Sequence, residues 1–320
     1  MGGTGVLAWT RGSGRGRFTS FAVSDWIGAD MGATRTGGFV IGFRRSGAAW
    51  QKDLGGLAAW AKANGFGAID VGRDGDVAAP QVAGAGLRVG SVDLAVWQPM
   101  ISADAGKRRD AVARNAEYVK ACAAAGAKVF FVVMLPEDAA LARKENFGYM
   151  VESYGELAKT LDAVGGRLAI EGWPGAGALC CTPEGLRALF KACPSPSLGV
   201  CFDPSHLLRM RIDPLRFVEE FGGRVWHCHG KDTELLDEAV YEYGIEQPPT
   251  FGQPKRFGGM TWRYTIPGHG VMRWGAGLAC LQRQGYKGVV SMELEDADFN
   301  GTEEGEKLGL TLGRAYLEGC

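Results

Sequence analysis

The 320-residue sequence predicts an α/β protein that forms a single (β/α)8 barrel with a long loop after its seventh strand. From Gly38 onward, short β-branched or aromatic runs alternate with Ala/Leu-rich stretches of helical spacing, which is typical of a parallel sheet. There are eight runs of each kind, and their short connections favour a closed TIM barrel over an open sheet. No GxGxxG motif follows the first run, which disfavours a dinucleotide-binding sheet.

The predicted strands are short runs rich in aliphatic, β-branched or aromatic residues, each followed by a polar or glycine-containing segment. They are residues 39–43, 68–71, 87–94, 128–134, 167–171, 198–202, 224–229 and 288–293. Strands buried on both faces read as continuous apolar runs of this kind, as expected for the wall of a parallel barrel.

The predicted helices follow these strands in turn. They are residues 50–64, 77–83, 106–125, 147–164, 183–192, 214–221, 271–284 and 302–317. Thr182-Pro183 and Asp213-Pro214 each place a capping side chain before a first-turn proline. Gly126, Gly165 and Gly285 stand where helices should end before the next strand.

Two parts of the chain differ from this repeat. Residues 1–37 are rich in Gly, Arg, Thr and Ser, so we expect a poorly ordered extension ahead of a catalytic barrel domain at residues 38–320. Residues 230–270 form the one long connection. It follows the seventh strand and should lie at the carboxyl-terminal face of the barrel, where loops usually carry function.

Composition excludes several classes of function. The 35 Lys and Arg residues balance 36 Asp and Glu residues, so no overall field favours nucleic acid or an anionic membrane. No apolar run is long enough to span a membrane and no secretory signal is evident, so we expect a cytoplasmic protein. The eight cysteines lack a CxxC motif and should be reduced core residues. The sequence does not decide whether the protein forms a homo-oligomer.

Four ionisable residues stand at the ends of successive predicted strands: Glu171, Asp203, His229 and Glu293. In a barrel these ends converge, and a carboxylate that closes an apolar strand is costly to bury unless it is paired or bound to metal. Alternatively, each acid caps the loop or helix that follows it. Taken together, the four predict one divalent cation; three carboxylates and an imidazole suit Mn²⁺ best, with Mg²⁺, Co²⁺ or Zn²⁺ as alternatives.

Four short motifs carry a family resemblance: residues 170–174 (IEGWP), 202–207 (FDPSHL), 227–232 (HCHGKD) and 292–294 (MEL). In this order they resemble the xylose-isomerase-like sugar phosphate isomerases and epimerases, which include D-tagatose and D-psicose 3-epimerases and inosose dehydratase. The resemblance covers about residues 38–318. It implies that Glu171, Asp203, His229 and Glu293 bind the metal, that Glu171 and Glu293 are also the acid/base pair, and that His206 binds substrate.

The sequence departs from the ketose 3-epimerases directly after the metal histidine. Those enzymes carry a substrate-binding arginine there, whereas this chain reads GKDTEL over residues 230–235. Lys231 either stabilises an enediolate or holds a substrate hydroxyl or phosphate, or it pairs with Asp232 or another surface acid. His227 lies two residues before His229 and is a candidate neighbour of the metal ligands.

Further residues are candidates for contacts with a sugar. The segment 261–270 contains Arg263 and His269 and is predicted to form a lid, or alternatively a packed surface loop. Trp97 and Trp173 follow strands three and five and either line the pocket or fill the core. The Arg44-Arg45 pair is interpreted as solvated rather than as an anion site.

These observations predict a divalent-metal-dependent isomerase or epimerase that acts on a small sugar or cyclic polyol. One Glu removes a proton next to a carbonyl and the other returns a proton elsewhere, through an enediolate. Loss of a β-hydroxyl from the same intermediate would instead make the protein a dehydratase acting on an inosose or keto-sugar. A phosphodiesterase resembling endonuclease IV and a non-catalytic sugar-binding barrel are the less favoured alternatives.

Overall fold

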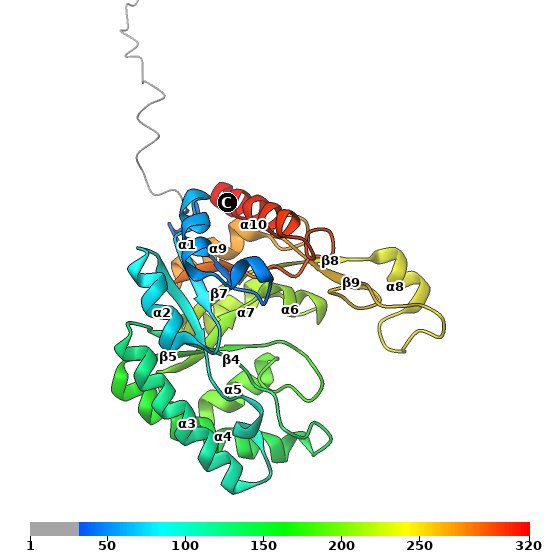
Figure 1. The fold of residues 1–320 in the computed structure, drawn as a ribbon. Helices are drawn as coiled ribbons and strands as arrows, with labels where there is room; N and C mark the ends of the chain where they lie inside the picture. The colour runs from blue at the N-terminus through cyan, green and yellow to red at the C-terminus, as the bar shows by residue number, and fades with distance from the viewer. Residues whose placement is uncertain (1–31) are drawn as a thin grey trace, which may run out of the picture. The chain divides into compact units, whose positions relative to one another are not determined.

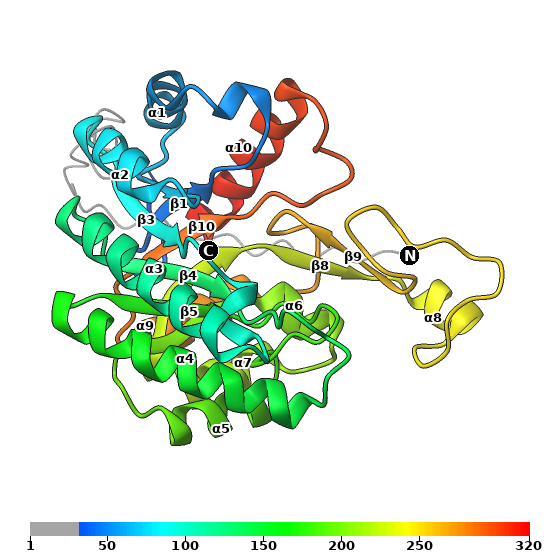
Figure 2. The ribbon, with the colours of Figure 1, turned by 60° about the horizontal axis from the view of Figure 1, so that its bottom comes forward.

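Eight parallel strands close into a barrel in the computed structural model, which describes residues 32–320 (Figures 1 and 2). Their order around the barrel is β1-β10-β7-β6-β5-β4-β3-β2. The strands are β1 Val40–Arg44, β2 Ala68–Val71, β3 Arg88–Asp93, β4 Val129–Val133, β5 Arg167–Glu171, β6 Leu198–Phe202, β7 Val225–Gly230 and β10 Val289–Met292. The predicted TIM barrel and its eight strands are confirmed.

Helices follow the strands on the outside of the barrel, apart from α8, which lies in the long connection after β7. They are α1 Leu54–Ala63, α2 Gly75–Gly84, α3 Ala105–Ala124, α4 Arg143–Val164, α5 Pro183–Ala192, α6 Pro204–Arg209, α7 Pro214–Phe221, α8 Asp237–Tyr243, α9 Trp274–Arg283 and α10 Glu303–Gly319. Thr182 and Asp213 cap α5 and α7 as predicted, because their side chains accept hydrogen bonds from first-turn backbone N–H groups. Gly165 ends α4 with φ of 65°, which a glycine adopts at little cost.

The main core lies between the barrel wall and the helices, and it is formed by aliphatic and aromatic side chains. Seven of the eight cysteines are buried and all eight are free, which agrees with their predicted role as core residues. The inside of the barrel is more polar, since Asp70, Ser291, His227 and His229 are all buried there. Within residues 32–320, no helix is both long and apolar enough to cross a bilayer.

The amino-terminal edge of the barrel begins earlier than the sequence suggested. Residues 1–31 of the expected extension lie outside the described residues, but residues 32–37 are part of the barrel unit. Ala33 forms an antiparallel bridge with Val40, and Thr34 is only 2% exposed. The Thr34 hydroxyl accepts a hydrogen bond from the backbone of Phe39, so this polar, glycine-rich segment packs through local turns rather than through apolar side chains.

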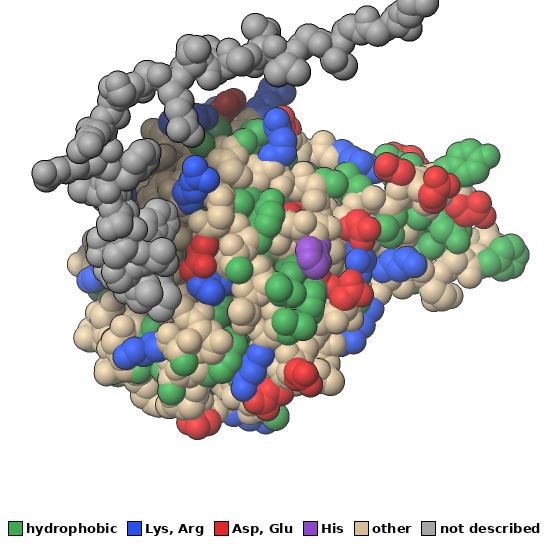
Figure 3. Space-filling model, turned by 90° about the horizontal axis from the view of Figure 1, so that it is seen from above, with side chains coloured by type: hydrophobic (Ala, Val, Ile, Leu, Met, Phe, Trp, Pro, Cys, Tyr) green, Lys and Arg blue, Asp and Glu red, His purple; other side chains and the backbone are tan. Residues whose placement is uncertain are grey.

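The long connection after β7 contains structure that the sequence did not predict. Strands β8 Asp232–Leu235 and β9 Trp262–Thr265 form an antiparallel pair, and α8 lies beyond them in a segment that projects from the barrel (Figure 2). Tyr241 and Phe251 in this projection are 88% and 93% exposed. Acidic and apolar side chains gather on it in the space-filling view (Figure 3). Four-residue strands with polar side chains give too weak a period-two pattern to recognise.

Asp232 fixes this antiparallel pair to the barrel. Its buried carboxylate accepts hydrogen bonds from the backbone N–H groups of Thr233 (2.8 Å), Met272 (2.9 Å) and Gly268 (3.3 Å), and from the indole of Trp274 (3.1 Å). Four donors from β8, from the segment after β9 and from α9 therefore meet at one side chain. Burial raises the pKa of Asp232, whereas these donors lower it; the net shift is upward.

We predict that Asp232→Ala lowers the free energy of unfolding by about 3 kcal/mol or more, since hydrogen bonds to a charged group are worth about 1.5–3 kcal/mol each and the donors would stay buried. Thermal and urea unfolding measure the change. Asp237→Ala, at the exposed start of α8, is the control and should change stability far less. We call the antiparallel pair of β8 and β9 the hairpin. Equal stability of the two variants would show that Asp232 does not anchor this hairpin to the barrel.

Candidate functional site

Four strand ends bring the predicted ligands together at the carboxyl-terminal side of the barrel. Glu171 is the last residue of β5, Asp203 follows β6, His229 lies in β7 and Glu293 follows β10. One ligand atom from each of them lies within 4.8 Å of the others. The structure therefore juxtaposes all four residues, as their positions at the ends of parallel strands predicted.

His229 stands at the centre of this group. Its Nδ1 atom is 2.6 Å from Glu171 Oε1, 3.4 Å from Glu293 Oε2 and 3.9 Å from Asp203 Oδ2. One imidazole nitrogen thus faces three carboxylates. Its other nitrogen, Nε2, lies 3.7 Å from Asp70 Oδ2 and makes no hydrogen bond with the described residues.

The two oxygens of Asp203 have different surroundings. Oδ1 accepts hydrogen bonds from the backbone N–H (2.8 Å) and the hydroxyl (2.6 Å) of Ser205, and so caps α6. Oδ2 faces the cluster, is buried and accepts no hydrogen bond from residues 32–320. The helix-capping alternative considered from the sequence therefore accounts for one oxygen of Asp203 and leaves the other directed at the cluster.

His206 reaches the same cluster from α6. Its Nε2 atom is 3.3 Å from Asp203 Oδ2 and 3.4 Å from Glu171 Oε2, yet it is buried without a hydrogen-bond partner among the described residues. Its Nδ1 atom shares a hydrogen bond of 2.7 Å with the Tyr264 hydroxyl. Tyr264 comes from β9, so the hairpin holds the ring of His206 in place. The sequence alone did not single out Tyr264.

Lys231 joins the carboxylates rather than its neighbour Asp232. The ammonium group donates to Glu293 Oε2 (2.5 Å) and Glu295 Oε2 (2.9 Å), and it lies 3.3 Å from Asp203 Oδ2. The residue is 1% exposed and its ammonium group lies 4.6 Å from the centre of the Tyr264 ring. Pairing with Asp232, one of the readings left open by the sequence, is therefore wrong.

Charge in this group is strongly coupled. Burial and the charge of Glu293 raise the pKa of Glu171, but the imidazoles of His206 and His229 outweigh them and the pKa falls. Burial also opposes ionisation of Glu293, whose pKa nevertheless lies well below its usual value because of Lys231 and His229. The same carboxylates raise the pKa of Lys231 against the effect of burial. A buried excess of carboxylates therefore attracts positive charge to this site.

These residues fit a divalent cation. Asp203 Oδ2 and His206 Nε2 are buried polar atoms without hydrogen-bond partners in the described chain, and such atoms are rare unless a ligand or water satisfies them. Three carboxylates and one imidazole are also a donor set for Mn²⁺, Mg²⁺, Co²⁺ or Zn²⁺.

A second buried group lies beneath His229. His227 Nε2 is 2.7 Å from Asp70 Oδ2, and the Ser291 hydroxyl donates to Asp70 Oδ1 at 2.9 Å. His227 thus neighbours His229, with ring centres 5.3 Å apart, but its bonded partner is Asp70 rather than one of the four predicted ligands. Burial raises the pKa of Asp70, but His227 and His229 lower it further, so this carboxylate is ionised beneath the site.

Arg44 belongs to the site, contrary to the prediction of a solvated Arg44-Arg45 pair. Its guanidinium donates two hydrogen bonds of 2.8 Å to Asp93, and its Nε lies 3.3 Å from Glu293 Oε1. Arg45 is not solvated either, because its side chain is only 19% exposed and pairs with Asp74 at 2.9 Å. Arg44 is the last residue of β1, and strand alternation turns its side chain toward the barrel opening while Arg45 turns outward.

The predicted sugar-contacting residues divide into two groups. Trp97 and Trp173 are half-buried and pack against a small core cluster with Phe131, whose ring lies 5.2 Å from that of His229. Both tryptophans therefore lie beside the site and are only partly buried, between the two alternatives of lining the pocket and filling the core. The structure does not bring Arg263 and His269 to the carboxylates.

Strand alternation explains why Arg263 turns away. In β9, Trp262 and Tyr264 share one face, with ring centres 4.8 Å apart, and Arg263 lies on the other. Arg263 pairs with Glu234 (2.5 Å) and Asp298 (2.8 Å) instead. His269 is exposed and lies near Phe299. The residue of this loop that reaches the site is therefore Tyr264.

Comparison with known proteins gives a family match that covers most of the barrel. Residues 58–315 match the family described as xylose isomerase-like TIM barrel. YfiH of Bacillus subtilis (strain 168), described as uncharacterized, is 32% identical over 144 residues, which is 44% of this chain and 44% of that protein.

Solved structures show the same barrel. D-psicose 3-epimerase from Clostridium cellulolyticum H10, determined with D-tagatose, matches with a TM-score of 0.63 and 16% identity, over 88% of this chain and 99% of that one. The IOLI protein with a bound zinc atom matches with a TM-score of 0.61 and 17% identity, over 87% of this chain and 95% of that one. At such identities the likeness concerns the fold.

We predict that the dialysed protein retains a divalent ion that Asp203→Asn loses, because the substitution removes one of the three negative charges that would attract and bind the ion. Elemental analysis after dialysis measures the bound metal. Asp213→Asn is the matched control, since Asp213 also caps a helix, α7, but is exposed. Equal metal content in the two variants would remove Asp203 from the proposed ligands.

Proposed function

Since the chain belongs to the xylose isomerase-like TIM barrel family, we propose that it is a divalent-metal-dependent sugar isomerase or epimerase that acts through an enediolate. The observation that carries this proposal is the pair Glu171 and Glu293, one buried and one partly buried carboxylate of lowered pKa that share one cluster with His229 and Lys231. The substrate class is a small sugar or cyclic polyol with a carbonyl group.

Glu171, Asp203, His229 and Glu293 would hold the metal, with Mn²⁺ as the first candidate; the zinc bound by the IOLI protein makes Zn²⁺ a second candidate. When bound, such an ion supplies Lewis-acid polarisation of a carbonyl, which makes the adjoining C–H more acidic. The remaining steps belong to side chains of this protein.

Proton transfer falls to Glu171 and Glu293 in this proposal. Both have lowered pKa values, so both are ionised near neutral pH and one can accept the proton from the carbon next to the carbonyl. They come from β5 and from the end of β10, strands that are separated by β6 and β7 around the barrel. Carboxylates from separated strands can flank a substrate carbon, as epimerisation requires: one removes a proton and releases it to solvent, and the other takes a proton from water and delivers it to the carbon.

Lys231 and His206 would stabilise the negative charge that develops on the substrate oxygens. Lys231 carries a positive charge into the cluster, and the buried Nε2 of His206 lacks a partner among the described residues and is free to donate or accept. Tyr264 fixes the other nitrogen of His206, so the ring keeps one orientation toward the substrate.

Two alternatives share parts of this site. If the enediolate loses a β-hydroxyl before it is reprotonated, the same residues make the protein a dehydratase, and the product tells the two reactions apart. A phosphodiesterase resembling endonuclease IV is less well supported, because such an enzyme needs several metal ions and a histidine-rich shell, whereas the four-ligand group here contains a single histidine. The free, buried thiols suit a reducing compartment, and we propose the cytoplasm.

We predict that Glu171→Gln and Glu293→Gln, each measured at saturating Mn²⁺, slow deuterium uptake from D₂O into a ketose or inosose substrate by at least about a hundredfold. General acid/base catalysis typically contributes about 10²–10⁴-fold, and an amide can neither accept nor return the proton. NMR of the substrate measures the exchange, and the exposed Glu156→Gln is the control. Near-normal exchange in both metal-loaded variants would assign proton transfer to other residues.

A second test concerns the hairpin. Tyr264→Phe removes one hydrogen bond to His206, so kcat/KM should fall by about three- to tenfold, the kinetic equivalent of about 0.5–1.5 kcal/mol. Tyr286→Phe is the matched control, because this buried hydroxyl also makes one hydrogen bond, to the backbone of Val289. If both variants lose stability and activity equally, Tyr264 supports the fold and does not position His206.

A further inference from the structure

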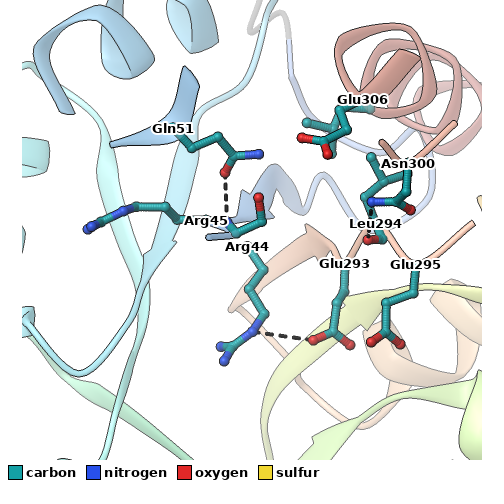
Figure 4. A pocket seen from close by; sticks show the side chains of 10 residues that line it. Arg44, Arg45, Gln51, Glu293, Leu294, Glu295, Asn300 and Glu306 are labelled. Atoms are coloured by element: carbon teal, nitrogen blue, oxygen red, sulfur yellow. Dashed lines mark hydrogen bonds and ion pairs between the residues drawn. The ribbon is translucent and has the colours of Figure 1, made fainter. Parts of the chain in front are cut away.

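A pocket of about 140 Å³ adjoins the carboxylate cluster on the side of β1 and α10 (Figure 4). Its lining includes Arg44, Gln51, Glu293, Glu295, Asn300 and Glu306. Glu293 and Arg44 belong to both the pocket and the cluster, so the two spaces share a wall. At the volume that water occupies in the liquid, the pocket holds about four or five water molecules, which is room for a short hydroxylated fragment.

Gln51 directs an unpaired amide into this pocket. The residue is 2% exposed, and its Oε1 accepts a hydrogen bond of 2.7 Å from the backbone N–H of Ser46. That bond fixes which end of the amide is oxygen, because a backbone N–H cannot donate to an NH₂ group. The Nε2 group points to the other side and has no acceptor among the described residues; Figure 4 shows it directed toward the Glu306 side of the pocket.

The opposite wall offers acceptors. Glu306 Oε2 accepts from the Trp50 indole at 2.7 Å, and its second oxygen has no partner in the described part of the chain. Asn300 already uses both ends of its amide, since its Oδ1 accepts from the backbone N–H of Asp296 and its Nδ2 donates to the backbone carbonyl of Leu294. A ligand therefore meets the NH₂ group of Gln51 as a donor and one carboxylate oxygen of Glu306 as an acceptor.

This arrangement suits hydroxyl groups, which both donate and accept, better than an anion. Arg44 points toward the carboxylates in the lining and Arg45 points away from them (Figure 4), and both arginines already pair with aspartates, Asp93 and Asp74. Glu295 is paired with Lys231. A phosphate would find no free cation here and would face the carboxylate of Glu306.

We propose that this pocket binds the hydroxylated end of the substrate that lies away from the reacting carbons, and that it selects a neutral, unphosphorylated sugar or polyol, with Gln51 as a specificity-determining residue. This proposal takes the position of the reacting carbons from the proposed function. The substrate class would then be neutral sugars or polyols without a phosphate group.

Sorbitol and sorbitol 6-phosphate test the proposal directly, by titration into ¹⁵N-labelled protein with and without Mg²⁺. The side-chain amide signal of Gln51 is identified by its absence in Gln51→Glu, which keeps the acceptor for Ser46 and removes the donor. Sorbitol should move this signal and leave that of the exposed Gln81 unchanged. Sorbitol 6-phosphate should bind at least about tenfold more weakly. Gln51→Glu should weaken sorbitol binding by about tenfold, and Gln81→Glu should not.

The outcomes separate the pocket from the reaction. If sorbitol fails to move the Gln51 signal, or if sorbitol 6-phosphate binds as tightly as sorbitol, the pocket proposal is wrong. An unchanged KM for a neutral substrate in Gln51→Glu would also overturn it, while leaving the proposed function in place. Sorbitol binding at Gln51, together with no deuterium exchange into any ketose or inosose, would support the pocket and contradict the proposed function. The shift of the Gln51 amide signal is measured in the wild-type protein, so it does not depend on how the variant folds.

Discussion

Burial of several carboxylates in one place is the constraint on which the rest of this site depends. Glu171, Asp203 and Glu293 meet at the carboxyl-terminal end of the barrel, where each desolvated negative charge is costly unless a cation compensates it. Lys231 and Arg44 supply compensating positive charge, and both form ion pairs with Glu293. A buried ion group of this kind is poor evidence for stability and good evidence for a site that handles charge.

The hairpin after β7 follows from the same constraint. Lys231 lies directly between β7 and β8, so the backbone that carries it must leave the barrel wall and turn along the site. Asp232 then binds four donors and fixes this turn, and the pairing of β8 with β9 brings Tyr264 over Lys231 and His206. The segment after β7 thus supplies the Lys231 ammonium to the carboxylates and the Tyr264 side chain that bonds to His206. The projecting residues around α8 have no part in this arrangement.

Much of this architecture could be predicted because barrel strands repeat a local pattern. Continuous apolar runs located every strand of the barrel, and the polar residues at their ends located Glu171, Asp203, His229 and Glu293, since parallel strand ends must converge. Local pattern could not reveal Arg44, whose role depends on Asp93 from another strand. Local pattern could not reveal Tyr264 either. The register of β9 against β8 decides that Tyr264 faces the site and Arg263 faces away. Pairings between distant segments are not encoded in neighbouring residues.

The distribution of the arginines and carboxylates then connects the chemistry to the choice of substrate. Arg44 stands between the cluster and the adjoining pocket, but its guanidinium is already committed to Asp93 and Glu293. The charge of Arg44 is therefore not available to a ligand in the adjoining pocket, and Lys231, which bonds to Glu293 and Glu295, does not line that pocket. What remains free is an amide and a carboxylate oxygen, which recognise hydroxyl groups. The need to neutralise the site thus restricts the adjoining pocket to neutral partners.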